Sequence, residues 1–510
     1  MKRPDILMFI SDHFRSDALS VNGNKAVQTK NIDAVALNDG ISIDNAFCQN
    51  PVCVPSRCSF LSGRYPHTGG FRTMHHLHGP DDLNLLRELK KQGYHIYFGG
   101  KNDVFREDVS LSEYCDYRSD AYKEMTAKIK GQALPMGYTP ILNAYTQAQA
   151  AEAAAMKEAA RKEPDSKYYY AIYQGEVSRD NPLAAGSLGA EDAQIADAVN
   201  YLRNYKGEQP LCMYLSLVCP HPWYAAFPED YERVHDKYVR PAIRLNDEQR
   251  ARKASILEGI RENHRLYQWS DEELFSLKRT YHAMIGHVDE NFGKVMDALK
   301  DTQRYEDTLV FMYSDHGDYA GDYEITEINQ NTFEDCLSKV PLVIKPPKRI
   351  EVRPGKRRAL AELLDIPATV AEIAGFELSE DEFGRSLVHL FACDEEHRDT
   401  VLCEGGRRET EKQCEDDNHS PDTLWWARTS VQIRIPEHTK AVMLRDHDFK
   451  YVFRYYEQDE LYDLKNDPEE RENLADDPEY AGIIQDMKNI LLERMIETCD
   501  VVPRTIDKRI

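Results

Sequence analysis

The chain has 510 residues, of which 41% are hydrophobic and 30% charged, a composition typical of a large globular protein and not of a disordered or collagen-like one. Its 88 acidic residues outnumber 64 basic ones, and the formal net charge of −24 argues against nucleic acid or an anionic membrane as a partner. No apolar run is long enough to span a bilayer or to act as a secretory signal, so we expect a cytoplasmic protein.

Four short apolar runs alternate with helix-like stretches along the chain. The expected strands cover residues 5–10, 95–98, 211–218 and 308–313. The expected helices cover residues 82–92, 191–205 and 274–299. Continuous apolar strands that alternate with helices are typical of a parallel sheet covered by helices, so the predicted fold class is α/β.

One long segment interrupts this alternation. Residues 105–190 are mostly polar and lack a strong strand, and within them residues 147–163 are Ala-rich with high helix propensity. We expect this segment to be an insertion above the sheet.

The character of the chain changes again near residue 396. Short antiparallel strands are expected within residues 441–456 and 460–464, and a closing helix over 480–497. The sequence therefore predicts an α/β domain over residues 1–395 and a small α+β domain over residues 396–510.

Polar residues follow each of the four predicted strands. They are Asp12 and His13, then Lys101 and Asp103, then His221, and finally Asp315 and His316. Because the carboxyl ends of parallel strands line one crevice, we expect these side chains to converge. Carboxylates with neutral imidazoles suit one divalent cation, and the oxygen-rich set favours Ca²⁺, Mg²⁺ or Mn²⁺ over structural Zn²⁺. Of these three ions we expect Ca²⁺. The other interpretation is that the Asp residues are helix N-caps and the His residues ordinary core groups.

The eleven cysteines do not form the dense framework of a small secreted domain, but Cys48, Cys53 and Cys58 are evenly spaced. Cys53 precedes Pro55 and Arg57 at the predicted start of a helix, where the helix dipole and a fixed positive charge favour a nucleophile. The alternatives are a three-cysteine metal or iron–sulfur site and a group of inert core thiols. A metal site is disfavoured because there is no C-x-x-C pair.

The run Cys53-Val-Pro-Ser-Arg57, followed by Leu61-Ser-Gly-Arg64, resembles the C-x-P-S-R signature of the type I sulfatases of the alkaline-phosphatase superfamily. The resemblance extends over nearly the whole chain, through residues 220–222, 314–317 and 460–464. It implies an alkaline-phosphatase-like fold, in which a large, mixed, mostly parallel sheet lies between helices and a smaller C-terminal domain is built on a short antiparallel sheet.

The resemblance also implies a reaction. In that family a maturation enzyme oxidises the motif cysteine to formylglycine, and one hydroxyl of the hydrated aldehyde attacks sulfur and displaces the alcohol. The second hydroxyl then lets the covalent sulfo-enzyme expel sulfate without a separate attack by water. For this chain the implied activity is arylsulfatase-like hydrolysis of a small sugar or aryl sulfate ester, with the maturation enzyme as a partner and homo-oligomer formation left open.

Carried over residue by residue, the resemblance assigns a role to each strand-end group. The implied metal ligands are Asp12, Cys53, Asp315 and His316, with His13 as a further candidate. Cys53 is also the precursor of the nucleophile. Arg57 and Lys101 match residues that stabilise the alkoxide, and His221 matches a residue that contacts the sulfate and the leaving oxygen.

Two positions depart from the family pattern. Asp103 stands where the family commonly has the imidazole that deprotonates the second hydroxyl, and Asn329 stands where a lysine commonly contacts the sulfate. Lys339 is a candidate to replace that lysine. These departures leave two alternatives to a sulfatase: a phosphonate monoester or phosphodiester hydrolase of the same superfamily, and a non-catalytic anion-binding relative.

Overall fold

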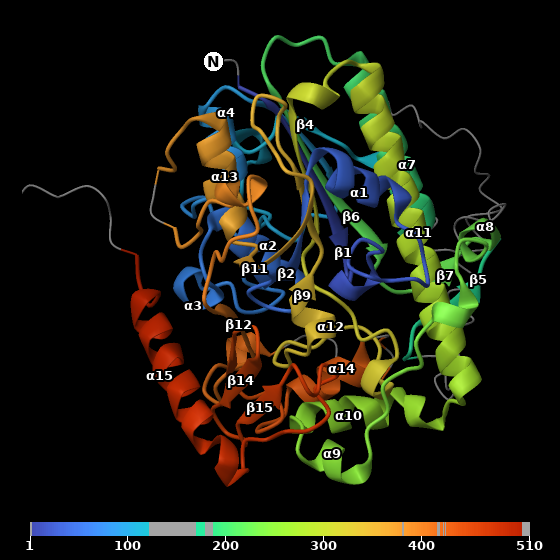
Figure 1. Cartoon of the computed structure of the whole chain (residues 1–510), viewed down its shortest axis with the longest axis vertical. Helices are drawn as coiled ribbons and strands as arrows, with labels where there is room; N and C mark the ends of the chain where they lie inside the picture. The colour runs from blue at the N-terminus through green and yellow to red at the C-terminus, as the bar shows by residue number, and fades with distance from the viewer. Residues whose placement is uncertain are drawn as a thin grey trace, which may run out of the picture.

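The computed structural model describes residues 3–121, 170–178, 187–379, 382–415, 419–421, 423 and 425–501. A nine-stranded sheet forms the centre of the molecule, and a four-stranded antiparallel sheet lies below it in Figure 1. The helix predicted over residues 147–163, and most of the predicted insertion, lie outside the described residues. No helix in the described part of the chain is long and apolar enough to cross a membrane.

The four predicted strands are present and lie side by side. They are β1 (Asp5–Asp12), β3 (His95–Gly100), β6 (Leu211–Pro220) and β8 (Thr308–Ser314). Their order in the sheet is β8-β1-β6-β3, and every pair is parallel. In this register Phe9 pairs with Leu215 on one side and with Met312 on the other. The carboxyl ends of the four strands therefore meet at one edge of the sheet.

Five further strands extend the sheet and were not predicted. They are β2 (Ile41–Phe47), β4 (Tyr117–Arg118), β9 (Lys339–Val340), β10 (Leu342–Lys345) and β11 (Gly355–Glu362). β10 runs antiparallel to both β8 and β2, so the sheet is mixed but mostly parallel. One further strand, β5 (Tyr173–Glu176), lies in the predicted insertion. It pairs with β7 (Tyr224–Ala226), which follows β6, in a separate small sheet.

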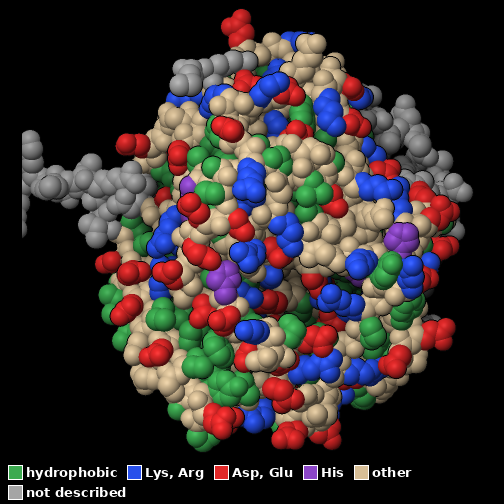
Figure 2. All heavy atoms as spheres, in the orientation of Figure 1, with side chains coloured by type: hydrophobic (Ala, Val, Ile, Leu, Met, Phe, Trp, Pro, Cys, Tyr) green, Lys and Arg blue, Asp and Glu red, His purple; other side chains and the backbone are tan. Residues whose placement is uncertain are grey.

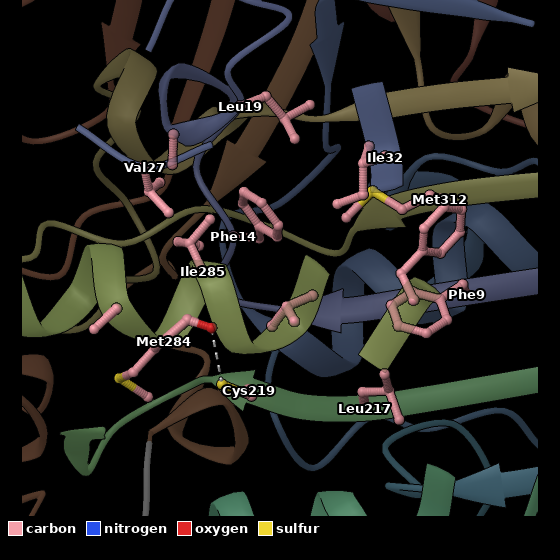
Figure 3. Close-up of a cluster of buried hydrophobic side chains, with 14 of the residues drawn as sticks. Phe9, Phe14, Leu19, Val27, Ile32, Leu217, Cys219, Met284, Ile285 and Met312 are labelled. Carbon is pink, nitrogen blue, oxygen red and sulfur yellow. Dashed lines mark hydrogen bonds between the residues drawn. The ribbon is translucent and has the colours of Figure 1, made fainter. Parts of the chain in front are cut away.

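Helices cover both faces of the large sheet, and each face has its own hydrophobic core (Figure 1). On one face lie α1 (Lys30–Ala34), α7 (Ser187–Asn204) and α11 (Asp271–Asp301). On the other lie α2 (Cys53–Ser62), α4 (Leu85–Lys91) and α13 (Asp365–Ala374). Alternate residues of β1 point to opposite faces: Phe9 joins the cluster around Ile285 that Figure 3 shows, and Met8 joins the other cluster.

α11 illustrates how the sequence defines an element. Its N-cap Ser270 accepts a hydrogen bond from the backbone N–H of Glu273, and the Glu273 side chain accepts one from the N–H of Ser270. The shorter helices are α3 (Pro66–Gly69), α8 (Pro228–Tyr231), α9 (Asp247–Ala251), α10 (Ser255–His264), α12 (Asp335–Ser338) and α14 (Trp426–Gln432).

The C-terminal part has the predicted α+β character. Its strands are β12 (Val401–Gly405), β13 (Ala441–Arg445), β14 (Phe449–Arg454) and β15 (Glu460–Asp463), paired antiparallel in chain order. The closing helix α15 (Ala481–Glu497) buries Met487 and Leu491 in a cluster with Tyr451. The α/β class with a small antiparallel C-terminal sheet is thus confirmed, and the domain boundary at residue 396 stays a prediction.

Acidic and basic side chains are interspersed over the face shown in Figure 2. Basic side chains on that face can attract an anion locally, although the whole chain carries a formal net charge of −24.

Candidate active site

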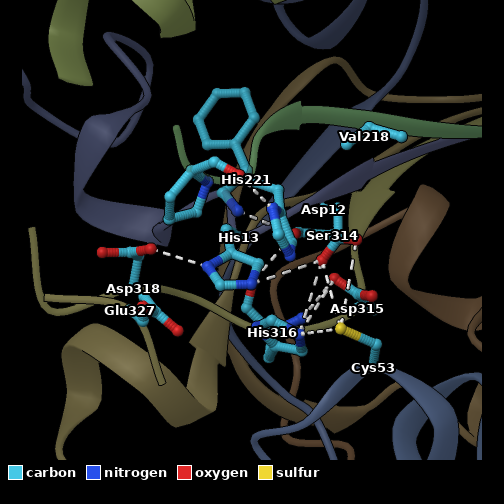
Figure 4. A network of polar contacts seen from close by, with 12 residues as sticks. Asp12, His13, Cys53, Val218, His221, Ser314, Asp315, His316, Asp318 and Glu327 are labelled. Carbon is cyan, nitrogen blue, oxygen red and sulfur yellow. Dashed lines mark hydrogen bonds and ion pairs between the residues drawn. The ribbon is translucent and has the colours of Figure 1, made fainter. Parts of the chain in front are cut away.

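The carboxyl ends of the four central strands bring the predicted site residues together (Figure 4). Asp12 ends β1, Lys101 follows β3, His221 follows β6 and Asp315 follows β8. α2 adds Cys53 and Arg57 from its first two turns. These six side chains, which come from positions as far apart as residues 12 and 315, therefore line one site.

Cys53 is the first residue of α2, and its thiol lies among charged groups. Its Sγ atom is 3.1 Å from Nε2 of His316, 3.5 Å from Nζ of Lys101 and 3.6 Å from Oδ1 of Asp12. Burial, reinforced by the Asp12 carboxylate, raises the pKa of the Cys53 thiol well above its ordinary value. Because the thiolate is the reactive form, Cys53 is a poor nucleophile at neutral pH as long as it stays a thiol.

Cys48 and Cys58 have different surroundings. Both are fully buried and lie in separate hydrophobic clusters, Cys48 near the carbonyl of Leu337 and Cys58 near that of Val104. In the described part of the chain, the group of side chains that could hold a metal consists of Asp12, His13, Cys53 and His316. It includes neither Cys48 nor Cys58. The geometry therefore does not support a three-cysteine metal or iron–sulfur site.

Arg57 is fully buried and links the two site carboxylates. Its Nε donates to Oδ2 of Asp315 at 2.7 Å, and its Nη2 lies 3.3 Å from Oδ2 of Asp12. Its Nη1 donates to the hydroxyl of Ser216 on β6. A buried guanidinium is stable only when paired, and here its partners come from three strands of the sheet.

The pKa values of Asp12 and Asp315 are shifted in opposite directions. Burial alone would raise the pKa of Asp12, but Lys101 and then Arg57 outweigh it and hold that pKa well below its usual range. Burial raises the pKa of Asp315 despite the adjacent Arg57. A cation bound between the two side chains would favour the ionised form of both.

The residues present fit a divalent cation. Ligand atoms of Asp12, His13, Cys53 and His316, all buried, lie within 4.8 Å of one another. Nε2 of His13 is buried with no hydrogen-bond partner among the described residues, and this is the atom that lies 3.8 Å from Oδ1 of Asp12. Asp315 adjoins the group, with its Oδ1 3.7 Å from Nε2 of His316. Oxygen and imidazole donors in this arrangement are suited to such an ion.

A second layer of contacts holds His13. Its Nδ1 lies 2.6 Å from Oδ2 of Asp318, which aims Nε2 at the cluster, and its backbone has a φ of +66°. Burial raises the pKa of Asp318 to about 7, and Tyr224 donates a hydrogen bond to its Oδ1 at 2.6 Å. Asp318 was not predicted; its place three residues after Asp315 at the same strand end is the signal that would have identified it.

The two departures from the family pattern have distinct surroundings. Asp103 contacts Lys101, with 2.8 Å between its Oδ2 and Nζ, and Lys101 in turn lies 2.7 Å from Asp12. Asn329 is fully buried, and its Nδ2 has no hydrogen-bond partner among the described residues. Lys339 lies on β9 with Nζ 3.9 Å from Asp44, outside the cluster, so it does not replace the missing lysine.

His221 lies on the side of His13 away from Cys53 (Figure 4). Its ring lies edge to face with that of His13, with centroids 4.4 Å apart. Burial, with His13 and Lys101, lowers the pKa of His221 to about 3, so the ring is neutral at pH 7. Its Nδ1 lies 2.5 Å from the carbonyl oxygen of Pro222, which can only accept, so the proton is on Nδ1 and Nε2 is left as an acceptor.

Curated relatives that match almost the whole chain include two bacterial proteins. The uncharacterised sulfatase YidJ of Escherichia coli K12 is 25% identical over 509 residues, which cover 97% of this chain and 88% of that protein. An N-acetylglucosamine-6-O-sulfatase of Bacteroides thetaiotaomicron is 22% identical, covering 96% of this chain and 86% of the relative.

Solved structures show the same fold. A phosphonate monoester hydrolase of Agrobacterium radiobacter superposes with a TM-score of 0.68 at 21% identity, covering 97% of this chain and 96% of the other. A structure in complex with its substrate D-glucosamine-2-N,6-O-disulfate gives a TM-score of 0.68 at 19% identity over 98% of both chains. The family model Sulfatase matches residues 4–376, well over half of the sequence. The chain belongs to the sulfatase family.

Proposed function

We propose that this chain hydrolyses a sulfate ester of a small sugar or aryl alcohol, using a formylglycine formed from Cys53 and one divalent cation. The observation that carries the proposal is the position of the Cys53 side chain at the start of α2, within 3.6 Å of Asp12, Lys101 and His316. Conversion by a maturation enzyme would replace a thiol that burial keeps protonated with a reactive hydrated aldehyde.

Asp12, His13, Asp315 and His316 are the residues that would hold the cation, together with the side chain at position 53. The two carboxylates are the ligands that favour Ca²⁺, with Mg²⁺ and Mn²⁺ as alternatives. Such an ion acts as a Lewis acid on the oxygens of a sulfate group.

The charged side chains around position 53 are arranged to stabilise negative charge. Asp103 and Asp12 hold the pKa of Lys101 well above its usual value against the effect of burial, so the ammonium is permanent at neutral pH. Arg57 supplies a second fixed positive charge in the same buried space. Preorganised charges of this kind stabilise an oxyanion more strongly in a buried site than in water.

His221 and Asp103 are the groups available for proton transfer. We assign His221 contact with the sulfate and the leaving oxygen. Because those oxygens only accept hydrogen bonds, this role requires a proton on Nε2, which the negative charge of the bound ester would favour; the neutral ring with a free Nε2 can act only as a base. Asp103 reaches the site through Lys101, and we assign it to orienting that lysine or acting as a weak base toward the second hydroxyl.

A sugar sulfate is the preferred substrate class because curated relatives are named for sulfated sugars, among them the N-acetylglucosamine-6-O-sulfatase. The second candidate function is phosphonate monoester hydrolysis, favoured by the equal TM-score of the Agrobacterium hydrolase. A cytoplasmic location remains a prediction, and it would restrict the substrate to a small imported ester.

The test is production of the protein with and without a formylglycine maturation enzyme, with Cys53→Ala as the control. Mass spectrometry of the peptide that contains residue 53 should show an aldehyde, and hydrolysis of an aryl sulfate and of N-acetylglucosamine 6-sulfate should scale with the converted fraction. Full activity in Cys53→Ala would contradict the assigned nucleophile. Faster hydrolysis of an aryl phosphonate would establish the second candidate, and a converted, metal-loaded protein without any activity would be a non-catalytic relative.

A further inference from the structure

α14 presents three side chains with binding chemistry on one face. Trp425 immediately precedes the helix, and Arg428 and Gln432 follow at spacings of three and four residues. Residues at these spacings lie on the same side of a helix. α14 belongs to the connection between β12 and β13, far in the sequence from the four central strands.

Contacts at both ends of this face place it against the active site. The ring of Trp425 lies 5.9 Å from that of His221, edge to face. At the other end, Nε2 of Gln432 lies 3.4 Å from Oδ1 of Asn329. Arg428 lies between them in the sequence of the helix, on the same side. The face therefore extends from His221 to Asn329.

Polar atoms along this face have no partner. Nε of Arg428, Nδ2 of Asn329 and Oε1 of Gln432 are buried without a hydrogen bond within the described residues. Asn329 and Gln432 are fully buried as whole side chains. Since buried polar groups are almost always paired, two donors and an acceptor left unpaired on this face and on the adjoining Asn329 point to a ligand that supplies the missing partners.

The positive charge of Arg428 is also unmatched, because this residue has no ion pair in the part of the chain that the structure describes. The nearby acid is Glu327, which Figure 4 shows beside Asp318 on the side of His13 away from Cys53. Burial raises the pKa of Glu327 to about 8, despite the opposing effect of Arg428, so its carboxyl is mostly neutral at pH 7. The guanidinium is therefore left to attract an anion from outside the protein.

We propose that Trp425, Arg428, Gln432 and Asn329 form a specificity subsite for the alcohol part of the substrate, and that this subsite selects a sulfated sugar carrying a second anionic group. This inference rests on the proposed function and names its substrate class. The indole of Trp425 packs against the apolar face of a sugar ring, and the two amides bind its hydroxyl groups. The planar guanidinium of Arg428 binds the second group, a sulfate or a carboxylate, through paired hydrogen bonds.

The test is calorimetric binding to the calcium-loaded protein with Cys53 left unconverted, so that no turnover occurs. The probes are D-glucosamine-2-N,6-O-disulfate, a sulfated uronic acid with its free carboxylate, and N-acetylglucosamine 6-sulfate, which lacks a second anionic group. We expect at least one of the two dianionic probes to bind about tenfold or more tighter than the third, the margin being set by a charge-assisted paired contact. Which of them does so identifies the second group as sulfate or carboxylate.

Arg428→Gln should abolish this preference. The matched control is Arg434→Gln, which removes the same charge from an exposed position just beyond the end of the helix and should leave the preference intact. An equal loss of affinity for all three probes in Arg428→Gln would place this residue at the reacting sulfate and overturn the proposal. Equal affinities of the parent protein for all three would overturn it as well.

A second variant covers the case in which Arg428→Gln does not fold. Arg428→Lys keeps the charge and loses the paired geometry, and we expect it to reduce the preference in part; an unchanged preference would overturn the proposal. Because binding is measured without catalysis, these outcomes are separate from a failure of the proposed function, which would appear as a converted enzyme that hydrolyses no ester.

Discussion

The thiol of Cys53 lies 3.1 Å from Nε2 of His316, although 263 residues separate them in the sequence. The first of the two begins α2 and the second follows β8, so their contact depends on how the helix packs on the sheet. This contact joins the proposed precursor of the nucleophile to a proposed metal ligand. Metal binding and chemistry at position 53 are therefore expected to depend on each other.

Asp315→Asn is expected to weaken calcium binding. The variant removes a negative charge from the cluster but keeps an oxygen that can accept the hydrogen bond from Nε of Arg57. We expect a loss of affinity of roughly 10- to 100-fold, measured by calorimetry. Asp247→Asn, at an exposed position on α9, is the matched control. Unchanged affinity in Asp315→Asn would mean that the ion binds elsewhere.

Glu191→Ala is expected to destabilise the end of β6 and displace His221. The Glu191 carboxylate accepts hydrogen bonds from the backbone N–H groups of Val218 at 3.1 Å and Cys219 at 2.6 Å. Leaving two buried donors unpaired should lower the free energy of unfolding by roughly 2 kcal/mol or more in urea titrations. Glu191→Gln keeps an acceptor oxygen and should lose less. Equal losses in the two variants would show that the hydrogen bonds contribute nothing beyond packing.

Protonation of His287 should stabilise the folded protein, and this contribution should be lost as the pH is raised. Its ring is buried between Asp192, 3.0 Å away, and Asp230, 3.4 Å away. Burial opposes protonation, but the two acids outweigh it and raise the pKa of His287 from 6.5 to about 10.

Because the folded-state pKa exceeds the unfolded one, the stabilisation is complete below pH 6.5, declines above it and is lost as the pH passes about 10. The difference in unfolding free energy between the parent and His287→Gln, measured in urea, should therefore shrink over that interval. A difference that stays constant from pH 6 to pH 10 would contradict the shift.

Asp103→Asn is expected to slow the second half of the reaction. If release of sulfate is rate-limiting, converted enzyme mixed with a chromogenic aryl sulfate should give a burst of phenol followed by slower turnover. The variant should lower the steady rate more than the burst, because it removes the carboxylate 2.8 Å from Lys101. Asp103→His is the comparison and should restore turnover. A linear time course with an unaffected variant would direct attention to His221 as the base.

Sequence patterns determined the parts of this protein whose signals are local. The four central strands are continuous apolar runs because both of their faces are buried, and α2 begins near Pro55 as the sequence predicts. Asp12 and Asp315 were placed at one edge because parallel strands share their carboxyl ends. The motif around Cys53 then connected this edge to a family.

The tertiary structure decided features that depend on partners distant in the sequence. β2 contains polar residues and gains its place by pairing with β10 and β11, about 300 residues later. His13 joins the residues that could hold a metal because Asp318 holds its ring, and Lys339 lies apart from them because it is on β9 near Asp44.

The same applies to the face of α14. Nothing in the local sequence of Trp425 or Gln432 shows that one reaches His221 and the other Asn329. Spacing along the chain determines which side chains share a helix face or a strand end. Which residues each face contacts depends on which distant element packs against it. That packing is decided by burial of the hydrophobic core, which involves residues from the whole chain.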